Sequence, residues 1–266
     1  MRIEKFDSLE STNKYCEALD LAQVEDFTCY WALAQTAGIG QRGNHWEAEP
    51  DKNLTFSLIL HPAFLPADQQ FKLTEALSLA LVDFLSFFLP ASQALSTDKS
   101  NHITAKNFHF SIKWPNDIYA NGQKICGTLI STHLATDHSS LITHRSSLIT
   151  SAISGIGLNV NQRVFPDWVP NPTSLALLTG NDYELEPLLR QLLACIEKRY
   201  VELKSGQDPE PEYLSHLLNL GSRARYIYNK EEITATITGV DPHGRLLLTT
   251  DGGQQLNCGM KEIVFL

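Results

Sequence analysis

The first stretch of this sequence that could do chemistry is glycine-rich: Gly38-Ile39-Gly40-Gln41-Arg42-Gly43. It matches G-x-G-x-x-G, which in a dinucleotide site is followed at once by a helix whose N-terminus holds the pyrophosphate. Here Trp46 and Pro50 follow, and then an expected strand at 53–60, which disfavours a dinucleotide-binding fold. The sequence also has no Walker A motif and lacks the companion motifs of a kinase. The loop could still bring backbone N–H groups and the Arg42 cation to an anion, or be an ordinary surface loop.

The second candidate is the motif Lys113-Trp114-Pro115-Asn116-Asp117, with Lys124 shortly after it. A proline in an apolar run forces an edge, a bulge or a kink, and so re-aims its neighbours. Asn116 and Asp117 would place an amide and a carboxylate at one point, although Asn-Asp is also common in simple turns. Lys124 opens the next strand, where its ammonium group would either face a pocket or extend into water.

Glycines interrupt two further strands that the sequence predicts. Gly127 lies in the strand expected at 124–131, and the segment Gly155-Ile156-Gly157-Leu158-Asn159-Val160-Asn161 ends the strand expected at 148–160. A glycine inside a strand allows either close packing or the close approach of a ligand. Both interpretations stay open from the residues alone.

Hydrophobic periodicity indicates the elements that must position these groups. Apolar residues at i, i+3, i+4 and i+7 predict helices at about 68–88, ended by Pro90, and at 185–203. Ser11-Thr12-Asn13 has the composition of a helix cap and predicts a short helix after it. The dipeptide Asn121-Gly122 predicts a type I′ hairpin between the strands on either side. Strands are expected at 27–35, 53–60, 108–112, 124–131 and 148–160, and polar loops at 91–107 and 132–147.

The last fifty residues change character. Short strands are expected at 225–228, 233–238, 246–249 and 263–265, separated by turns at 241–244 and 251–253. Closely spaced short strands are typical of a small barrel-like β domain. A short helix after the break at 205–211 leads into this tail. We therefore predict two domains, residues 1–217 and residues 218–266.

Composition excludes several classes of protein. The chain has 266 residues, of which 43% are hydrophobic, so it is long enough to bury a sizeable core. Its formal net charge of -9 argues against general binding of nucleic acid. The five cysteines form no C-x-x-C pair, so neither a disulfide framework nor a zinc site is indicated. No secretory signal and no apolar run of about 18 residues is present, which predicts a cytoplasmic protein without a membrane partner.

Taken in their order along the chain, these motifs resemble those of the biotin–protein ligase family. The resemblance spans roughly residues 3–200, and residues 239–246 look like part of the family's small SH3-like C-terminal domain. It implies an α+β fold, in which a mixed central sheet is flanked by helices as in class II synthetases, with a C-terminal SH3-like β-barrel. The motifs that carry it are Ser11-Thr12-Asn13, Gln35 with the glycine loop through Trp46, the Lys-Trp-Pro-Asn-Asp motif with Lys124 and Gly127, residues 155–161, and Asn171-Pro172-Thr173-Ser174-Leu175.

The resemblance also implies an activity. The family joins biotin to ATP as biotinyl-5′-AMP, with Mg²⁺, and transfers the biotinyl group to a lysine of a biotin carboxyl carrier protein. Two alternatives stay open: an adenylating enzyme like the lipoate–protein ligases, and a degenerate, non-catalytic biotin-binding homologue. The sequence leaves the choice between a monomer and a homodimer open.

Family roles are carried over only onto matching positions. The resemblance implies that Lys124 and Arg42 are catalytic, and it assigns no metal ligand. It implies nucleotide contacts at Arg42, Asn116, Asp117 and Asn159. It implies biotin contacts at Ser11, Thr12, Asn13, Gln35, Gly38, Gly40, Gln41, Trp46, Lys124 and Gly127.

This sequence departs from the family pattern at several positions. Ile39 stands where the family commonly has arginine, so a cation expected near the phosphates is missing. Gln41 also stands where arginine often occurs, although some members have glutamine there. We expect activity to be retained through Arg42 and Lys124, with Ile39 affecting the rate and the retention of the adenylate. Ser131 stands where many members have an acid. The chain begins within the expected catalytic domain, which implies the type without an N-terminal helix-turn-helix domain and without a transcriptional role.

Overall fold

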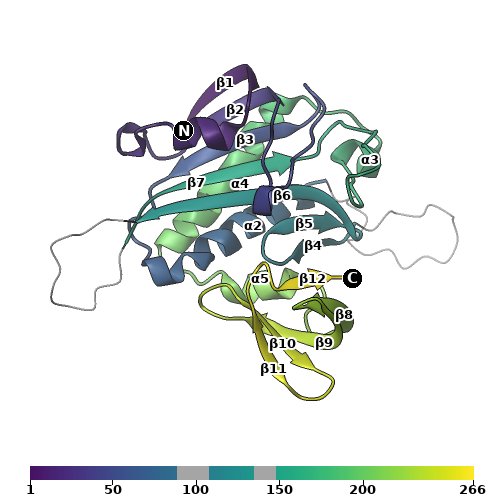
Figure 1. Ribbon diagram of the computed structural model, residues 1–266. Helices are drawn as coiled ribbons and strands as arrows, with labels where there is room; N and C mark the ends of the chain where they lie inside the picture. The colour runs from purple at the N-terminus through teal and green to yellow at the C-terminus, as the bar shows by residue number, and fades with distance from the viewer. Residues whose placement is uncertain (89–107, 135–147) are drawn as a thin grey trace, which may run out of the picture.

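The computed structural model describes residues 1–88, 108–134 and 148–266, and a seven-stranded mixed sheet dominates it (Figure 1). The strand order is β1-β2-β3-β7-β6-β5-β4. β1 runs parallel to β2, and every other neighbouring pair is antiparallel. The strands are β1 (Arg2–Leu9), β2 (Thr28–Gln35), β3 (Leu54–Leu60), β4 (Phe110–Lys113), β5 (Asp117–Ala120), β6 (Gln123–Leu134) and β7 (Ile149–Leu158).

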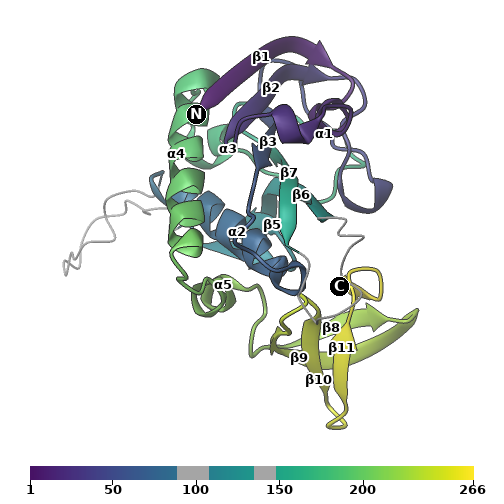
Figure 2. The ribbon, with the colours of Figure 1, turned by 90° about the vertical axis from the view of Figure 1, so that its left-hand side faces the viewer.

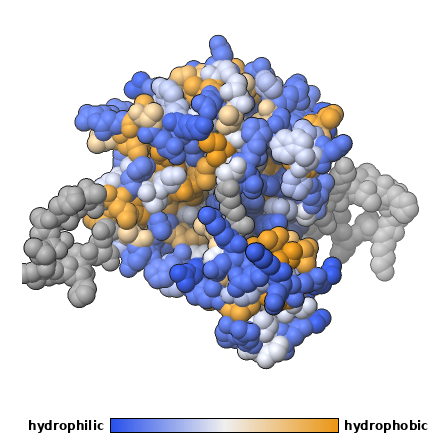
Figure 3. Space-filling view, in the orientation of Figure 1, coloured by the Kyte–Doolittle hydropathy of each residue, from blue (hydrophilic) through white to orange (hydrophobic). Residues whose placement is uncertain are grey.

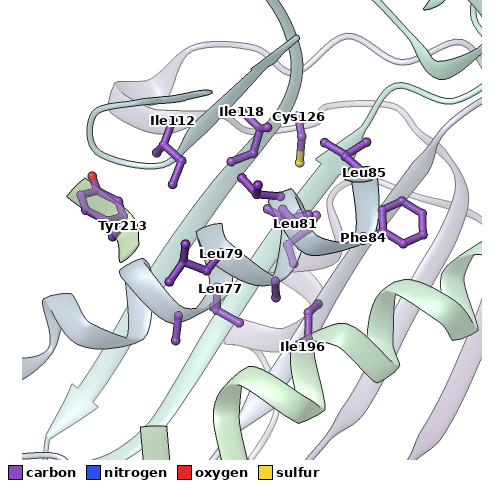
Figure 4. Packing of buried hydrophobic residues seen from close by; sticks show 14 of the residues in the cluster. Leu77, Leu79, Leu81, Phe84, Leu85, Ile112, Ile118, Cys126, Ile196 and Tyr213 are labelled. Carbon is purple, nitrogen blue, oxygen red and sulfur yellow. The ribbon is translucent and has the colours of Figure 1, made fainter. Parts of the chain in front are cut away.

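Two long helices cover one face of this sheet, and α1 lies on the other face (Figure 2). Figure 4 shows side chains of α2, among them Leu77, Leu81 and Leu85, packed between the sheet and Ile196 of α4. Their spacing of four residues places them on one stripe of the helix, and their burial stabilises this layer. The helices are α1 (Thr12–Glu17), α2 (Phe71–Ser86), α3 (Leu175–Thr179), α4 (Leu185–Lys204) and α5 (Glu210–His216), with short 3-10 turns η1 (Leu21–Gln23), η2 (Gln41–Gly43) and η3 (Ala67–Gln69).

A second, five-stranded antiparallel sheet follows α5, in the order β11-β10-β9-β8-β12. Its inward-facing residues Tyr226, Ala235, Ile237, Leu246 and Leu248 are fully buried. The expected boundary at 217/218 falls between α5 and β8, and the division into two domains there stays a prediction. The strands are β8 (Arg223–Tyr228), β9 (Glu231–Val240), β10 (Leu246–Thr250), β11 (Gln255–Cys258) and β12 (Ile263–Phe265).

The turn between β9 and β10 docks the second sheet onto the first. Trp114 Nε1 donates a hydrogen bond of 3.0 Å to the carbonyl oxygen of Gly244 in this turn. Gly244 has a φ of +81°, and a Cβ there would overlap the ring of Phe71 at the start of α2. Only glycine combines this backbone conformation with so close an approach, so the contact between the two sheets depends on it.

The two long helices, the short helix after Ser11 and nine of the twelve strands in the described residues lie where the sequence predicts them. The strands β1, β5 and β11 were not predicted. As a result the expected hairpin was right in its second strand, β6, and wrong in its first: Asn121 and Gly122, with φ of +50° and +79°, join β5 to β6. The loop expected at 132–147 was wrong at its start, because residues 132–134 continue β6. Pro90, the rest of that loop and the loop at 91–107 lie outside the described residues.

No helix among the described residues is both long enough and apolar enough to cross a membrane.

Candidate functional site

A pocket of about 290 Å³ opens on the face of the large sheet that α2 and α4 leave free. Its walls come from the start of α1, the glycine loop at 38–46, the β4–β5 turn, β6 and β7. The second sheet contributes the edge strand β12 to the same pocket. Figure 3 shows hydrophobic surface beside β12, where Val264 and Leu266 are exposed. Segments from both ends and from the middle of the chain therefore meet at one site.

One end of the pocket is polar, and its groups are held by each other. The side-chain oxygen of Gln35 accepts hydrogen bonds from Thr12 N at 2.7 Å and from Thr12 Oγ1 at 3.2 Å. Ser57 Oγ, which has a single hydrogen to donate, lies within hydrogen-bond distance of Thr12 Oγ1, at 2.8 Å, and of Asn13 Oδ1. Gly155 has no side chain because Asn13 occupies that space. This network offers a ligand both donors and acceptors in fixed positions.

The glycine loop folds back over the sheet as a narrow flap. Ile39 and His45 form a β-bridge, and Trp46 N donates to Gly38 O at 2.9 Å. The flap therefore carries the indole of Trp46 onto β6 and β7, where Gly157 and Gly127 leave room for it. A Cβ at Gly157 would overlap the indole ring. Of the two interpretations that the sequence left open, Gly127 and Gly157 therefore serve the close packing of a protein side chain, the indole of Trp46.

Lys124 lies beside the flap and makes an ion pair across the pocket wall. Its Nζ is 2.7 Å from Asp117 Oδ2 and 5.7 Å from the centre of the Trp46 ring. Backbone hydrogen bonds to Asn171 and Thr173, both 2.8 Å long, fix the start of β6 from behind. The cation and the flap therefore share one site.

Asn116 ties the flap to the β4–β5 turn. Its Oδ1 accepts a 2.8 Å hydrogen bond from Gln41 Nε2, and its Nδ2 donates to Thr128 O at 3.3 Å. Lys113 and Asp117 face each other across this turn, so the Lys-Trp-Pro-Asn-Asp motif is the tip of a hairpin. The turn expected as the simpler alternative is present, and it is the turn that brings the amide and the carboxylate to the pocket.

A second lysine borders the pocket next to the C-terminal strand. Lys113 Nζ lies 5.2 Å from the ring centre of Phe265 and 5.4 Å from that of Tyr119. Burial lowers the pKa of Lys113; the charge of Asp117 opposes this effect and that of Lys124 adds to it. The described lining of the pocket therefore has two ammonium groups on one side and one carboxylate, an excess of positive charge that suits an anionic ligand.

Two polar atoms of pocket residues, Thr128 Oγ1 and Trp46 Nε1, are buried without a hydrogen-bond partner among the described residues. Buried polar groups are nearly always satisfied, so such atoms at a pocket indicate places where a ligand or water would bind.

Most of the residues that the resemblance implies line this pocket, but some do not. Gly38 lies beneath Trp46 and Gln35, behind the surface, and Asn116 acts through its bonds to Gln41 and Thr128. Asn159 is outside the pocket lining, where its Nδ2 donates to Thr173 O at 2.9 Å. The backbone of Arg42 is in η2, and its side chain lies outside the described part of the chain. Those that line the pocket are Ser11, Thr12, Asn13, Gln35, Gly40, Gln41, Trp46, Asp117, Lys124 and Gly127.

The structure adds residues that the sequence did not single out for this site. Lys113, Thr128 and the three residues of β12 line the pocket. Lys113 and Thr128 stand in or next to motifs already noted, so proximity to them was the available signal. Nothing local in β12 points to a binding role, because its place depends on the docking of the whole second sheet.

No group of three or more His, Cys, Asp or Glu side chains among the described residues could hold a metal ion. The carboxylate of Asp117 is already paired with Lys124. Mg²⁺ prefers several oxygen ligands and often takes most of them from phosphates and water. The side chains present therefore do not form a resident metal site by themselves.

Comparison with known proteins matches most of the chain. Residues 5–149 match the biotin/lipoate A/B protein ligase family, and residues 220–259 match the biotin protein ligase C-terminal domain. The chain is 30% identical to the bifunctional ligase/repressor BirA of Bacillus spizizenii, over 93% of this chain and 69% of that protein. It is 28% identical to the biotin–[acetyl-CoA-carboxylase] ligase of Paracoccus denitrificans, over 93% and 94% of the two chains. The biotin protein ligase of Aquifex aeolicus, solved in complex with biotin and ATP, has the same fold, with a TM-score of 0.73, 24% identity, and coverage of 100% of this chain and 98% of that one.

Proposed function

Because this chain belongs to the biotin/lipoate A/B protein ligase family, we propose that it is a biotin–protein ligase that works through biotinyl-5′-AMP. Relatives named as biotin–[acetyl-CoA-carboxylase] ligases support this choice. The observation that carries it here is the position of the Trp46 flap beside Lys124 in one pocket. A flap over a cation is what a reaction between two anions requires, since water must be excluded and charge offset.

We propose that the fused ring of biotin occupies the polar end of the pocket. A ureido group both donates and accepts hydrogen bonds, which the Thr12 hydroxyl and the Gln35 amide are placed to match. Trp46 would cover the apolar part of the ligand, and the carboxylate at the end of the biotin chain would reach Lys124. The distribution of polar, aromatic and cationic groups along the pocket supports this orientation.

In the first reaction a carboxylate oxygen of biotin attacks the α-phosphorus of ATP. The new O–P bond forms as the bond to the β-phosphate oxygen breaks, so pyrophosphate leaves with its electron pair. Lys124 and Arg42 are proposed to offset the charge of the two reactants, with Asn116 and Asp117 beside the nucleotide. Mg²⁺ is proposed to arrive with the triphosphate, since the described side chains provide no site of their own for it.

In the second reaction the amine of an acceptor lysine attacks the acyl carbon of the mixed anhydride. An amide forms, AMP leaves, and the amine loses a proton, for which Asp117 is the candidate acceptor within the pocket. We propose a biotin carboxyl carrier protein as the partner, on the strength of the named relatives. The five cysteines are all free and buried, which agrees with a reducing, cytoplasmic setting.

A comparison of biotin with lipoate as the acid substrate tests the proposal. The protein is incubated with ATP and either biotin or lipoate, and the acyl-adenylate and pyrophosphate are measured, with and without a carrier domain. We expect biotin-dependent pyrophosphate release and a carrier heavier by one biotinyl group. Adenylation of lipoate alone would make it a lipoate–protein ligase. Tight binding of biotin without pyrophosphate release would make it a binding protein, which is the outcome that Ile39 in the flap makes worth testing.

A further inference from the structure

Tyr213 of α5 reaches the turn that carries Asn116 from outside the pocket. Its side chain is fully buried, and its hydroxyl group donates a 2.8 Å hydrogen bond to the carbonyl oxygen of Pro115. Pro115 directly precedes Asn116, so this bond acts on the peptide group from which Asn116 begins. Burial keeps the pKa of Tyr213 well above its ordinary value, with the charge of Glu75 adding to the effect, so the hydroxyl stays a donor.

The position of that peptide group matters because Asn116 makes contacts in two directions. Its side chain accepts from Gln41 on the flap at 2.8 Å and donates to the Thr128 carbonyl on β6 at 3.3 Å. Hydrogen bonds weaken steeply when the donor and acceptor move apart by half an ångström or lose alignment. A small shift of the β4–β5 turn would therefore release Gln41, and with it one end of the flap.

Tyr213 is itself anchored to the helical layer, so it can hold a fixed position. The ring of Phe71 in α2 packs against it edge-on, with 5.7 Å between ring centroids. The neighbouring Glu212 accepts two hydrogen bonds of 2.7 Å from Arg199 of α4. Arg199 also makes a two-pronged pair with Asp83 of α2, at 2.6 and 2.8 Å. This bidentate network fixes α5 against both long helices.

We propose that Tyr213 is a positioning residue for adenylate formation, which holds the flap closed through Pro115, Asn116 and Gln41. The inference rests on the proposed function, and it concerns the same pocket. Tyr213 does not line that pocket, so it acts only through the turn. Its role differs from that of Tyr200, whose buried hydroxyl has no hydrogen-bond partner among the described residues and which serves packing alone.

The test compares Tyr213→Phe with Tyr200→Phe in the full-length protein. Each change removes one buried hydroxyl, but only the first removes a hydrogen bond. We expect Tyr213→Phe to lower kcat for biotin-dependent pyrophosphate release about three- to tenfold, the range of one net hydrogen bond. The KM for biotin should stay within about twofold, because the Thr12–Gln35 end is untouched. Tyr200→Phe should leave kcat unchanged.

Measuring Tyr213→Phe in a protein that already carries Gln41→Ala shows whether the loss of kcat depends on the flap. Gln41→Ala has already lost the bond to Asn116, so adding Tyr213→Phe should lower kcat less than about twofold further, since the two changes remove one shared contact. An undiminished loss in that background would overturn the route through Asn116 and Gln41.

Amide hydrogen exchange gives a readout that needs no turnover. In Tyr213→Phe we expect faster exchange in residues 114–117 and 38–46, and in Tyr200→Phe no change there. If the wild-type protein made no adenylate, the proposed function would fail, and exchange would still decide the positioning role. Equal exchange and equal kcat in the two variants would overturn it. If Tyr213→Phe fails to fold, the same measurements are made on Glu212→Gln. This change weakens the contact of α5 with Arg199 and keeps the Tyr213 hydroxyl group.

Discussion

Lys124 Nζ lies 2.7 Å from Asp117 Oδ2, and each of these side chains is only 27% exposed. The pair stands at the point where the flap, β6 and the β4–β5 turn meet. Before substrates bind, the carboxylate satisfies the ammonium group. An incoming carboxylate or phosphate must share or replace that contact, so the strength of the pair sets how available the cation is.

Replacing Lys124 by alanine should therefore slow biotin adenylation at least tenfold. The lost contact is a charge-assisted hydrogen bond to an anion, worth about 1.5–3 kcal/mol. The rate of biotin-dependent pyrophosphate release measures the loss of adenylation. Lys198→Ala, on the exposed face of α4, is the matched control and should keep wild-type rates. Unchanged turnover in Lys124→Ala would remove the role given to this lysine.

Gly157→Ala should weaken biotin binding about tenfold or more while the protein stays folded. The new methyl group would occupy the space of the Trp46 indole and push the flap away from the sheet. Overpacking of this kind costs about 1–3 kcal/mol. Titration with biotin measures the change in Kd. Gly239→Ala in β9 introduces a methyl group that meets no neighbour within 4 Å. If both variants bound biotin equally well, the flap would not depend on this contact.

Gly244→Ala should destabilise the docking of the second sheet. A residue with a Cβ is strained at a φ of +81° and would also overlap Phe71. Gly253→Ala is the control, since it has a similar φ of +83° and no neighbour within 4 Å. We expect the melting temperature of Gly244→Ala to lie at least about 3 °C below that of Gly253→Ala, for an excess cost of about 1–3 kcal/mol. Equal melting temperatures would mean that backbone strain accounts for the whole loss of stability and that the contact with Phe71 adds nothing to it.

The buried carboxyl group of Glu75 in α2 predicts a dependence of stability on pH. Burial, with the charges of Glu210 and Asp208 adding to it, raises the pKa of Glu75 from 4.5 to about 8. Between these two values the folded protein keeps a proton that the unfolded chain has released. The free energy of unfolding therefore falls as the pH rises through this window and levels off above it.

Glu75→Gln should remove this part of the pH dependence. Urea unfolding at about pH 5 and about pH 9 measures it for both proteins, and the difference between them isolates Glu75 from the other titrating groups. We expect the wild type to lose a few kcal/mol more than the variant between the two conditions. Parallel losses would show that Glu75 is not protonated in the folded state.

The sequence predicted the large elements because each of them has a local pattern of hydrophobic residues. Every residue of β3 is buried, and its apolar run was recognised. β1 carries charged residues along an edge and has no fully buried residue, so neither alternation nor an apolar run marks it. β5 and β11 have four residues each and lie directly beside segments that were interpreted as turns, so no strand was predicted for them. These strands are recognised only from their hydrogen bonds to the neighbouring strands.

The site was predictable as far as its motifs extend and no further. The order of the motifs indicated Gln35, Trp46 and Lys124, which the fold brings into one pocket. Asn159 belongs to a motif but follows the end of β7, and its side chain donates to Thr173 O outside the pocket lining. Tyr213 acts on a residue 98 positions away, a relationship that depends on how α5 packs and that no local pattern encodes.

The most direct measurement is a crystal structure of the protein grown with biotin and ATP. We expect continuous density for biotinyl-5′-AMP, with the ureido ring at Thr12 and Gln35, the indole of Trp46 over the ligand, and the acyl-phosphate within hydrogen-bond distance of Lys124. Density for the joined product elsewhere on the molecule, or biotin bound in this pocket with its carboxylate pointing away from Lys124, would contradict the account.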